Sequence, residues 1–324
     1  MAAIEPSLGR VSTGQTAAGI AEALVSNVER VVLGKTEVLR LVVAALLARG
    51  HVLIEDAPGM GKTLLAKALA RSLGGTAGRV QGTVDLLPAD ITGVTVFEQE
   101  QRTWEFRAGP LFHNVVLFDE INRATPRAQA ALLEAMAEGQ VSADGGVYPL
   151  PAPFFVLATQ NPNGEAGTFP LVSGEYDRFA ICVSLGLPDR ASERALLRGV
   201  GGRSALEDLA PVVDPESFVA ACTDVEQLYA APAVEDYVLD IADATRSHGS
   251  VTHGISPRAT QLLLQVAKGH AVVDGRTYAT PDDVQAVAVA VLAHRLGSDM
   301  HTVGASASRA AVEELLASVA VPEI

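Results

Sequence analysis

The sequence predicts an α/β fold, in which a doubly wound parallel sheet is followed by an all-helical domain. Short apolar runs alternate with helical periodicity up to residue 187. Most of these runs are apolar throughout, as parallel strands buried on both faces are. After Pro188 only helical periodicity remains. We therefore expect an N-terminal arm at residues 1–20, an α/β core at 21–187 and a helical lid domain at 188–324.

The apolar runs give the expected strands of the sheet in chain order. They occupy residues 51–55, 79–83 (the weakest run), 115–119, 154–159 and 179–185. Helices are expected at 37–49, before the first strand, and from Gly61 onward and at 124–138, between the strands. Residues 86–112 and 139–153 break the alternation with Gly, Pro and alternating residues, so we interpret them as insertions or hairpins on one face of the sheet.

Helix starts in the second domain are marked by their capping residues. Thr280-Pro281-Asp282-Asp283 offers an N-cap hydroxyl, Pro in the first turn and acidic side chains, and Ser256-Pro257 repeats the first two features. These signals predict two helices that begin just after Thr280 and Ser256.

Composition and charge exclude several classes of protein. The chain has 324 residues, 48% hydrophobic and 19% charged, which suits a folded enzyme-sized protein. The net charge of -14 opposes nucleic acid and anionic membranes as partners. Two distant cysteines, Cys182 and Cys222, fit a reducing compartment, and no run suits a leader or a membrane span. We expect a cytoplasmic protein without membrane insertion.

The segment HVLIEDAPGMGKT predicts a phosphate-binding loop between a strand and a helix. Gly59 and Gly61 let the backbone approach phosphates, Lys62 suits the β and γ phosphates, and Thr63 offers a hydroxyl to Mg²⁺. The predicted nucleotide-binding residues are Asp56, Ala57, Pro58, Gly59, Met60, Gly61, Lys62, Thr63 and Leu64. Asp56 stands where such loops usually have Gly. It places an anion near an anionic ligand, so it either tunes or weakens nucleotide binding.

Two further strands end in polar residues that suit phosphate chemistry. VVLFDEIN ends in two acids, of which Asp119 suits the shell of Mg²⁺ and Glu120 suits activation of the attacking water. FFVLATQNP places Asn161 where it can hydrogen-bond a γ-phosphate or that water. The carboxyl ends of parallel strands share one edge, so these residues are expected near the loop.

Two arginines are the remaining candidates for contacts with phosphate. Arg178 precedes the last apolar run, and Arg258 lies in the first turn of a predicted helix. A cation there opposes the helix dipole, which indicates that Arg258 interacts with an anionic group elsewhere, such as a phosphate. The alternative for either residue is a solvated or acid-paired arginine.

Together these motifs resemble AAA+ ATPases, and most closely the MoxR family. Beyond the motifs above, the signatures are LLPADITG, FRAGPLF, DEINRA, ALLEAMAEGQV, PLPAPFFVLATQNP and TPDDVQAVAVAVLAHRL, within residues 31–296. The resemblance implies a core with a five-stranded parallel sheet, an insertion in helix 2 near 86–97 and a hairpin near 139–153, before the sensor 1 strand. The segment PLVSGEYDRF departs from the more common PLPEAQLDRF but retains the arginine.

The resemblance also implies roles for single residues. Asn161 would be sensor 1, Arg258 sensor 2 in the site of its own chain, and Arg178 the arginine finger that reaches a neighbour's ATP. Val32, Leu33 and Gly34 would contact adenine. The implied cofactors are ATP and Mg²⁺, the latter held by Thr63 and Asp119.

The expected function is ATP-driven, chaperone-like remodelling or maturation of a partner complex. The resemblance implies a homo-oligomer, a hexameric ring, that works beside a von Willebrand factor A-domain protein on an unknown client. Two alternatives stay open: a nucleotide-dependent scaffold with little turnover, since no aromatic-hydrophobic-Gly threading loop follows Thr83, and a metal-chelatase subunit or DNA motor. Negative charge argues against the DNA motor.

Overall fold

The computed structural model has a parallel sheet at its centre, as the apolar runs predict. The structure describes residues 15–100, 102–161, 168–247, 254–296 and 305–323. The strand order is β2-β5-β8-β1-β9, and all neighbouring pairs are parallel. The strands are β1 (His51–Glu55), β2 (Ala77–Gln81), β5 (Val115–Asp119), β8 (Phe155–Gln160) and β9 (Phe179–Val183). The expectation of a five-stranded parallel sheet is confirmed.

Successive residues of each central strand serve two different cores. Val52 and Ile54 of β1 pack with helices on one face of the sheet, whereas Leu53 packs on the opposite face. The first face is covered by α1 (Ala17–Glu29), α2 (Thr36–Leu47) and α3 (Lys62–Ser72), and the second by α5 (Pro126–Glu138). Burial on both faces explains why these strands are apolar throughout.

The weakest predicted strand is displaced from its expected position. It spans 77–81 rather than 79–83, and its side chains alternate between exposed and buried. β2 is one of the two edge strands of the sheet, and the side chains on one of its faces are exposed to solvent. That alternation weakened the apolar signal from which the strand was predicted.

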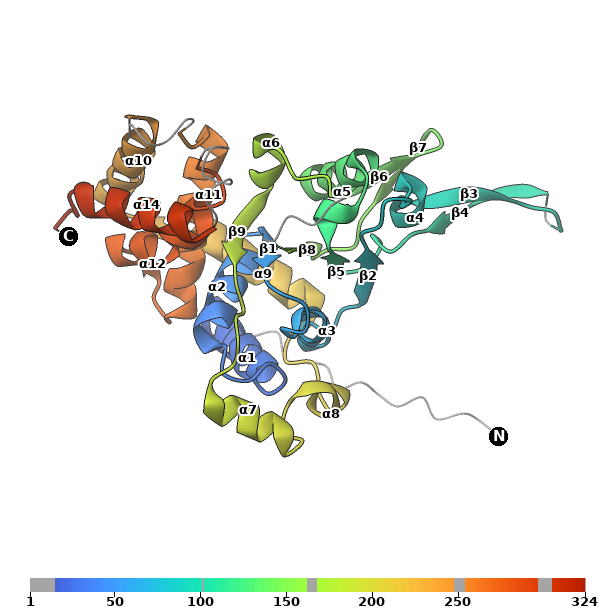
Figure 1. Ribbon diagram of the computed structural model, residues 1–324, viewed down its shortest axis with the longest axis horizontal. Helices are drawn as coiled ribbons and strands as arrows, with labels where there is room; N and C mark the ends of the chain where they lie inside the picture. The colour runs from blue at the N-terminus through green and yellow to red at the C-terminus, as the bar shows by residue number, and fades with distance from the viewer. Residues whose placement is uncertain (1–14, 101, 162–167, 248–253, 297–304, 324) are drawn as a thin grey trace.

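The two irregular segments are hairpins, as expected. Residues 86–112 contain α4 (Pro88–Thr92) and the antiparallel pair β3 (Gly93–Glu98) and β4 (Thr103–Ala108). Residues 139–153 contain β6 (Gln140–Ala143) and β7 (Gly146–Pro149), also antiparallel. Phe106 stacks on Tyr148 at a ring distance of 3.8 Å, which joins the two hairpins. Figure 1 shows β3 and β4 projecting at one end of the long axis, with the C-terminal helices at the other.

The second half of the chain is almost entirely helical. Within the core, η1 (Ile121–Arg123) follows β5 and α6 (Ser173–Tyr176) precedes β9. The helices after β9 are α7 (Arg190–Leu197), α8 (Gly202–Glu207), α9 (Pro215–Glu226), α10 (Pro232–Ser247), α11 (Pro257–Val273), α12 (Pro281–Leu292) and α14 (Ala305–Ser318). Ser256 and Thr280 cap α11 and α12, as predicted. Two short strands, β10 (Tyr229–Ala230) and β11 (Tyr278–Ala279), were not predicted. Two residues each are too few to leave a period in the sequence.

The expected domain boundaries do not coincide with breaks in packing. The first helix begins at Ala17, capped by Thr16, so part of the expected arm is helical, while residues 1–14 lie outside the described residues. One continuous apolar core includes α1–α3 and also α9–α12. In the described residues no helix combines the length and the apolar surface that crossing a bilayer requires.

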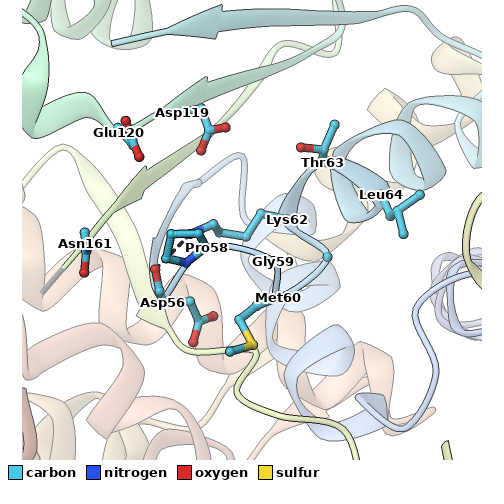
Figure 2. A pocket seen from close by; sticks show the side chains of 11 residues that line it. Asp56, Pro58, Gly59, Met60, Lys62, Thr63, Leu64, Asp119, Glu120 and Asn161 are labelled. Atoms are coloured by element: carbon cyan, nitrogen blue, oxygen red, sulfur yellow. Dashed lines mark hydrogen bonds between the residues drawn. The ribbon is translucent and has the colours of Figure 1, made fainter. Parts of the chain in front are cut away.

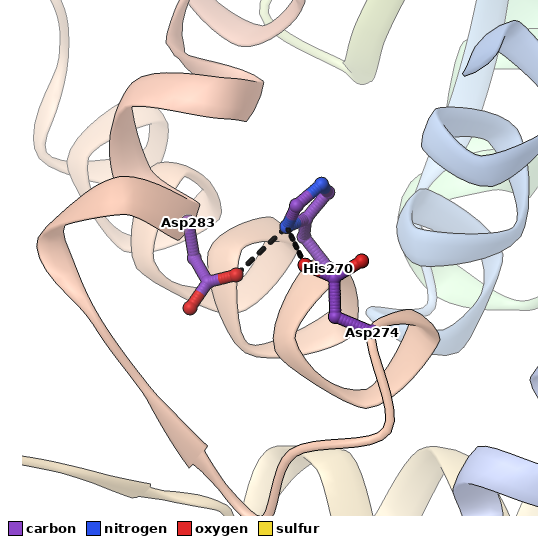
Figure 3. A group of neighbouring side chains, drawn as sticks. All are labelled: His270, Asp274 and Asp283. Carbon is purple, nitrogen blue, oxygen red and sulfur yellow. Dashed lines mark hydrogen bonds and ion pairs between the residues drawn. The ribbon is translucent and has the colours of Figure 1, made fainter.

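An ion-pair network fixes the C-terminal end of α11. Figure 3 shows three residues of this network: His270 of α11, Asp274 directly after that helix, and Asp283 of α12. His270 Nδ1 lies 2.7 Å from Asp283, and Arg276 pairs with both Asp274 and Asp283. Arg40 of α2 also pairs with Asp274. The two guanidinium groups neutralise the two carboxylates, so we interpret the cluster as a clasp between the lid and the core rather than a metal site.

Candidate functional site

The loop between β1 and α3 has the shape that a phosphate site needs. Gly59 and Gly61 have φ of 88° and 87°, in the left-handed region where a side chain would be strained. Lys62 then begins an 11-residue helix, whose amino end carries unpaired N–H groups and a positive dipole. The backbone here is prepared for an anion.

The predicted phosphate-binding residues line one cavity at the carboxyl edge of the sheet. Its volume is about 180 Å³, and Figure 2 shows Asp119 and Glu120 across it from the loop. The lining residues are Asp56, Pro58, Gly59, Met60, Gly61, Lys62, Thr63, Leu64, Asp119, Glu120 and Asn161. The structure thus brings together three segments separated by up to 105 residues of sequence, from Asp56 to Asn161.

Lys62 is held by the loop itself. Its Nζ donates to the main-chain oxygens of Asp56 at 2.9 Å and Ala57 at 3.3 Å. Ala57 takes part through this carbonyl and is not among the residues that line the cavity. The ammonium group therefore lies in the loop that would surround the phosphates.

Both acids at the end of β5 are held by polar neighbours. Thr159 is fully buried; its hydroxyl donates to Asp119 Oδ1 at 2.7 Å and accepts from the Glu120 N–H at 2.9 Å. Arg79 donates to Asp119 Oδ2 at 2.9 Å. Glu120 has a φ of 56°, a strained conformation for glutamate, which turns its side chain away from the strand.

Three of these neighbours were missed by sequence reasoning. Gln81 Nε2 donates to Glu120 at 3.1 Å, and Arg123 donates to the same oxygen at 3.0 Å. Arg79 and Gln81 are two residues apart on β2, so they share one face of that strand. Their partners lie about 40 residues further along the chain, and only the pairing of β2 with β5 brings them together. Thr159 and Arg123 did have a local signal, because they stand inside the quoted ATQNP and DEINRA motifs.

A larger, mostly apolar cavity continues from the phosphate cavity. Its volume is about 650 Å³, and both cavities share Pro58, Gly59, Met60, Gly61 and Leu64. Its other lining residues are Val31, Val32, Leu33, Lys35, Leu187, Pro188, Glu193, Leu196 and Leu197. Val32 and Leu33 were expected here. Gly34 does not line the cavity but lies against Ser192 of α7.

The contribution of α7 to this cavity was not predicted. None of the residues of α7 is buried, and Leu197 is 89% exposed although it is apolar. Exposed leucines beside a cavity of this size suit a planar apolar group such as a purine base. The periodicity of α7 indicated a helix, but not the surface that it faces.

Asp56 does not direct its carboxylate at the phosphate cavity. It is only 6% exposed, and its oxygens accept hydrogen bonds from Ser184 and from the backbone of Leu185 and Gly186. In Figure 2 the carboxylate points away from Asp119 and Glu120. The carboxylate that the sequence placed near the ligand therefore accepts three hydrogen bonds from residues 184–186.

The two predicted arginines lie at the opposite edge of the sheet. Arg178 precedes Phe179, which pairs with His51 at the start of β1, and it donates to the main-chain oxygen of Leu133 at 3.1 Å. The five residues of β1 put about 13 Å between this edge and the loop. Arg178 thus lies about the length of β1 away from the loop of its own chain.

Arg258 lies near the same edge, next to Ser256 and close enough to His51 to affect its pKa, whereas the sequence placed it in the nucleotide site of its own chain. The neighbouring Ser256 donates to Asp177 at 2.8 Å, and Asp177 pairs with Arg295 at 3.0 Å. Burial lowers the pKa of His51 to about 4, and the nearby charge of Arg258 adds to this effect. The packing of α11 and α12 against the start of β9 sets this position, and helix capping alone could not reveal it.

Comparisons with known proteins agree with this geometry. Residues 51–181 match the family model described as "ATPase family associated with various cellular activities (AAA)", and residues 243–315 match that of the AAA lid domain. YeaC of Bacillus subtilis is 42% identical over 300 residues, which cover 92% of this chain and 93% of that protein. Chaperone MoxR1 of Mycobacterium tuberculosis is 34% identical, covering 94% and 82%. A solved Cytophaga hutchinsonii structure, proposed to be an ATPase, superposes with a TM-score of 0.85 at 30% identity, covering 95% and 96%.

Proposed function

Because the chain belongs to the MoxR family of AAA+ ATPases, we propose that it hydrolyses ATP in a ring and uses the energy to remodel a partner protein. One observation carries the proposal. The phosphate-binding loop and two acids lie at the carboxyl edge of the sheet, while Arg178 and Arg258 lie at the amino edge. Each chain therefore holds parts of two sites, and two chains are needed to complete one.

Thr63 and Asp119 are the proposed ligands of Mg²⁺. The hydroxyl and the carboxylate line the same cavity, and oxygen donors of this kind suit the ion. When bound, Mg²⁺ would neutralise charge on the β and γ phosphates. Thr159 fixes the direction of the Asp119 carboxylate through its 2.7 Å hydrogen bond.

Glu120 is the proposed general base. It lines the phosphate cavity, and its backbone N–H donates to the Thr159 hydroxyl, which fixes the position from which the side chain extends. A carboxylate in this position can accept the proton of the water that attacks the γ-phosphate. Asn161 lines the same cavity and would orient that water or the phosphate through its amide. Lys62 would pass from the loop carbonyls to the phosphate oxygens.

Arg178 and Arg258 are the proposed donors to the ATP of the neighbouring subunit. A ring places the amino edge of one chain against the carboxyl edge of the next, which is a heterologous contact. Two guanidinium groups would then stabilise the charge that develops on the transferred phosphoryl group. We propose a hexamer, a von Willebrand factor A-domain protein as the partner, and a client that this partner presents. The name of Chaperone MoxR1 supports chaperone-like work of this kind.

The test measures ATP turnover per subunit against protein concentration. A shared site predicts that turnover falls on dilution, and that E120Q abolishes hydrolysis while ATP binding persists. Constant turnover far below the concentration at which the protein assembles would contradict the shared site. A wild-type protein that binds ATP and responds to a partner without hydrolysis would instead support the scaffold alternative.

A further inference from the structure

The buried carboxylate of Asp56 connects two parts of the nucleotide cavity. Its Oδ1 accepts from Ser184 Oγ at 2.7 Å and from the Gly186 N–H at 3.2 Å, and its Oδ2 accepts from the Leu185 N–H at 2.6 Å. Asp56 is the first residue of the phosphate-binding loop, and 184–186 immediately follow β9. These three bonds tie segments that are about 130 residues apart in sequence.

The segment tied by Asp56 leads directly to one wall of the apolar cavity. Leu187 and Pro188 line that cavity, and α7, which begins at Arg190, adds Leu196 and Leu197. Because α7 buries none of its residues, hydrophobic packing does little to hold this wall. Polar contacts must hold it. Besides Asp56, Lys35 Nζ donates to the Leu187 oxygen at 2.5 Å.

We propose that Asp56 is a positioning residue that holds the wall formed by residues 187–197 against the phosphate-binding loop, so that the base and the phosphates of ATP are bound together. The inference rests on the proposed function, because it assumes that ATP occupies both cavities. It assigns Asp56 a role in binding adenosine, although the residue belongs to the loop that binds phosphate. Removing the carboxylate leaves the glycines and Lys62 in place but frees the wall.

Titrations with two probes test this role. ATP and inorganic tripolyphosphate, each with Mg²⁺, are titrated calorimetrically into the wild type, D56N and D56G. We expect ATP to bind about tenfold more weakly to both variants, the loss associated with hydrogen bonds to a charged group, while tripolyphosphate binding changes by less than about twofold. A purely structural fault in the loop would weaken both probes alike.

Two further variants distinguish the loss of these hydrogen bonds from a general folding defect. S184A removes one donor and keeps the carboxylate, so it should shift the affinity for ATP in the same direction by a smaller factor. D90N is the matched control. Asp90 of α4 accepts a hydrogen bond from the backbone N–H of Leu87, just before that helix, and it lies outside both cavities. Its affinities should equal those of the wild type.

Two results would overturn the inference. If tripolyphosphate binds several-fold more tightly to D56N, the carboxylate acts as a repelling anion. If both probes weaken equally in D56N and S184A, Asp56 supports the loop and not the wall. A wild-type protein that binds neither probe would contradict the proposed function itself, which distinguishes the two failures.

Discussion

The two edges of the sheet differ in how their functional residues are held and in how visible they are in the sequence. At the carboxyl edge, Lys62, Asp119 and Glu120 sit in or next to short motifs and line one cavity. At the amino edge, Arg178 and Arg258 depend on contacts between the lid and the start of β9. The difference supports the proposal that one chain carries two half-sites, which assembly of neighbouring chains would join.

Of the substitutions that test this difference between the two edges, the one at Arg178 should have the largest effect. We predict that R178A lowers the rate of ATP turnover about a thousandfold, as loss of an arginine finger does, while the affinity for ATP changes little. Steady-state kinetics and a binding titration measure the two quantities. R127A, on the exposed side of α5, is the matched control and should keep wild-type turnover. Normal hydrolysis by R178A would remove the amino edge from the mechanism.

The clasp at the far end of α11 tests how much the buried ion pairs between lid and core stabilise the fold. Burial alone would raise the pKa of Asp283, but hydrogen bonds from Arg276, His270 and Thr280 outweigh it and hold that pKa well below its usual range. We predict that D283N lowers the free energy of unfolding by about 3–4 kcal/mol, because it leaves Arg276 without its buried partner. Denaturant unfolding measures the loss.

The partly exposed Asp274 provides the comparison for that variant. D274N should cost less than about 1 kcal/mol, since ion pairs that reach solvent contribute little. Equal losses in the two variants would mean that the clasp does not depend on the buried carboxylate.

His51 should make the amino edge sensitive to acid. Its Nδ1 accepts from the Val156 N–H, which requires a neutral ring, and burial lowers its pKa from 6.5 to about 4. Unfolding then takes up a proton, so this stability is complete above about pH 6.5 and is lost as the pH falls toward 4, up to about 3 kcal/mol. Unfolding free energies of the wild type and H51Q from pH 7 to 5 measure it. Parallel profiles for the two proteins would show that another group titrates.

Arg79 gives the smallest effect and concerns the carboxyl edge. Its side chain is 53% exposed, and it holds an Asp119 oxygen that we assign to Mg²⁺. We predict that R79A lowers the Mg²⁺ concentration for half-maximal ATP binding by up to about fivefold, because an exposed ion pair is worth at most about 1 kcal/mol. Arg123 pairs with Glu120 instead of Asp119, so R123A should leave this Mg²⁺ concentration unchanged. A higher Mg²⁺ requirement in R79A would show that Arg79 helps the site.

Much of the fold and the carboxyl edge could be predicted because their signals are local. A run of four buried residues in β1 and the glycines after it lie within a dozen positions. The partners of Asp56 could not be predicted, since Ser184 is 128 residues away and its loop has no periodicity. The position of Arg258 could not be predicted for a related reason: its motif marks a helix start, whereas packing of the lid decides where that start lies. The bounds of β2 could not be predicted because its exposed and buried residues alternate, so no apolar run marks them.

Mixing two inactive variants tests the central claim most directly. E120Q lacks the general base at its carboxyl edge but keeps both arginines at its amino edge. The double variant R178A/R258A lacks the arginines but keeps an intact carboxyl edge. If the edges of neighbouring chains form one site, mixed rings should regain ATP turnover in roughly a quarter of their sites, the share that random assembly gives. A mixture that stays as inactive as its two components would contradict the shared site with both arginines supplied by the neighbour.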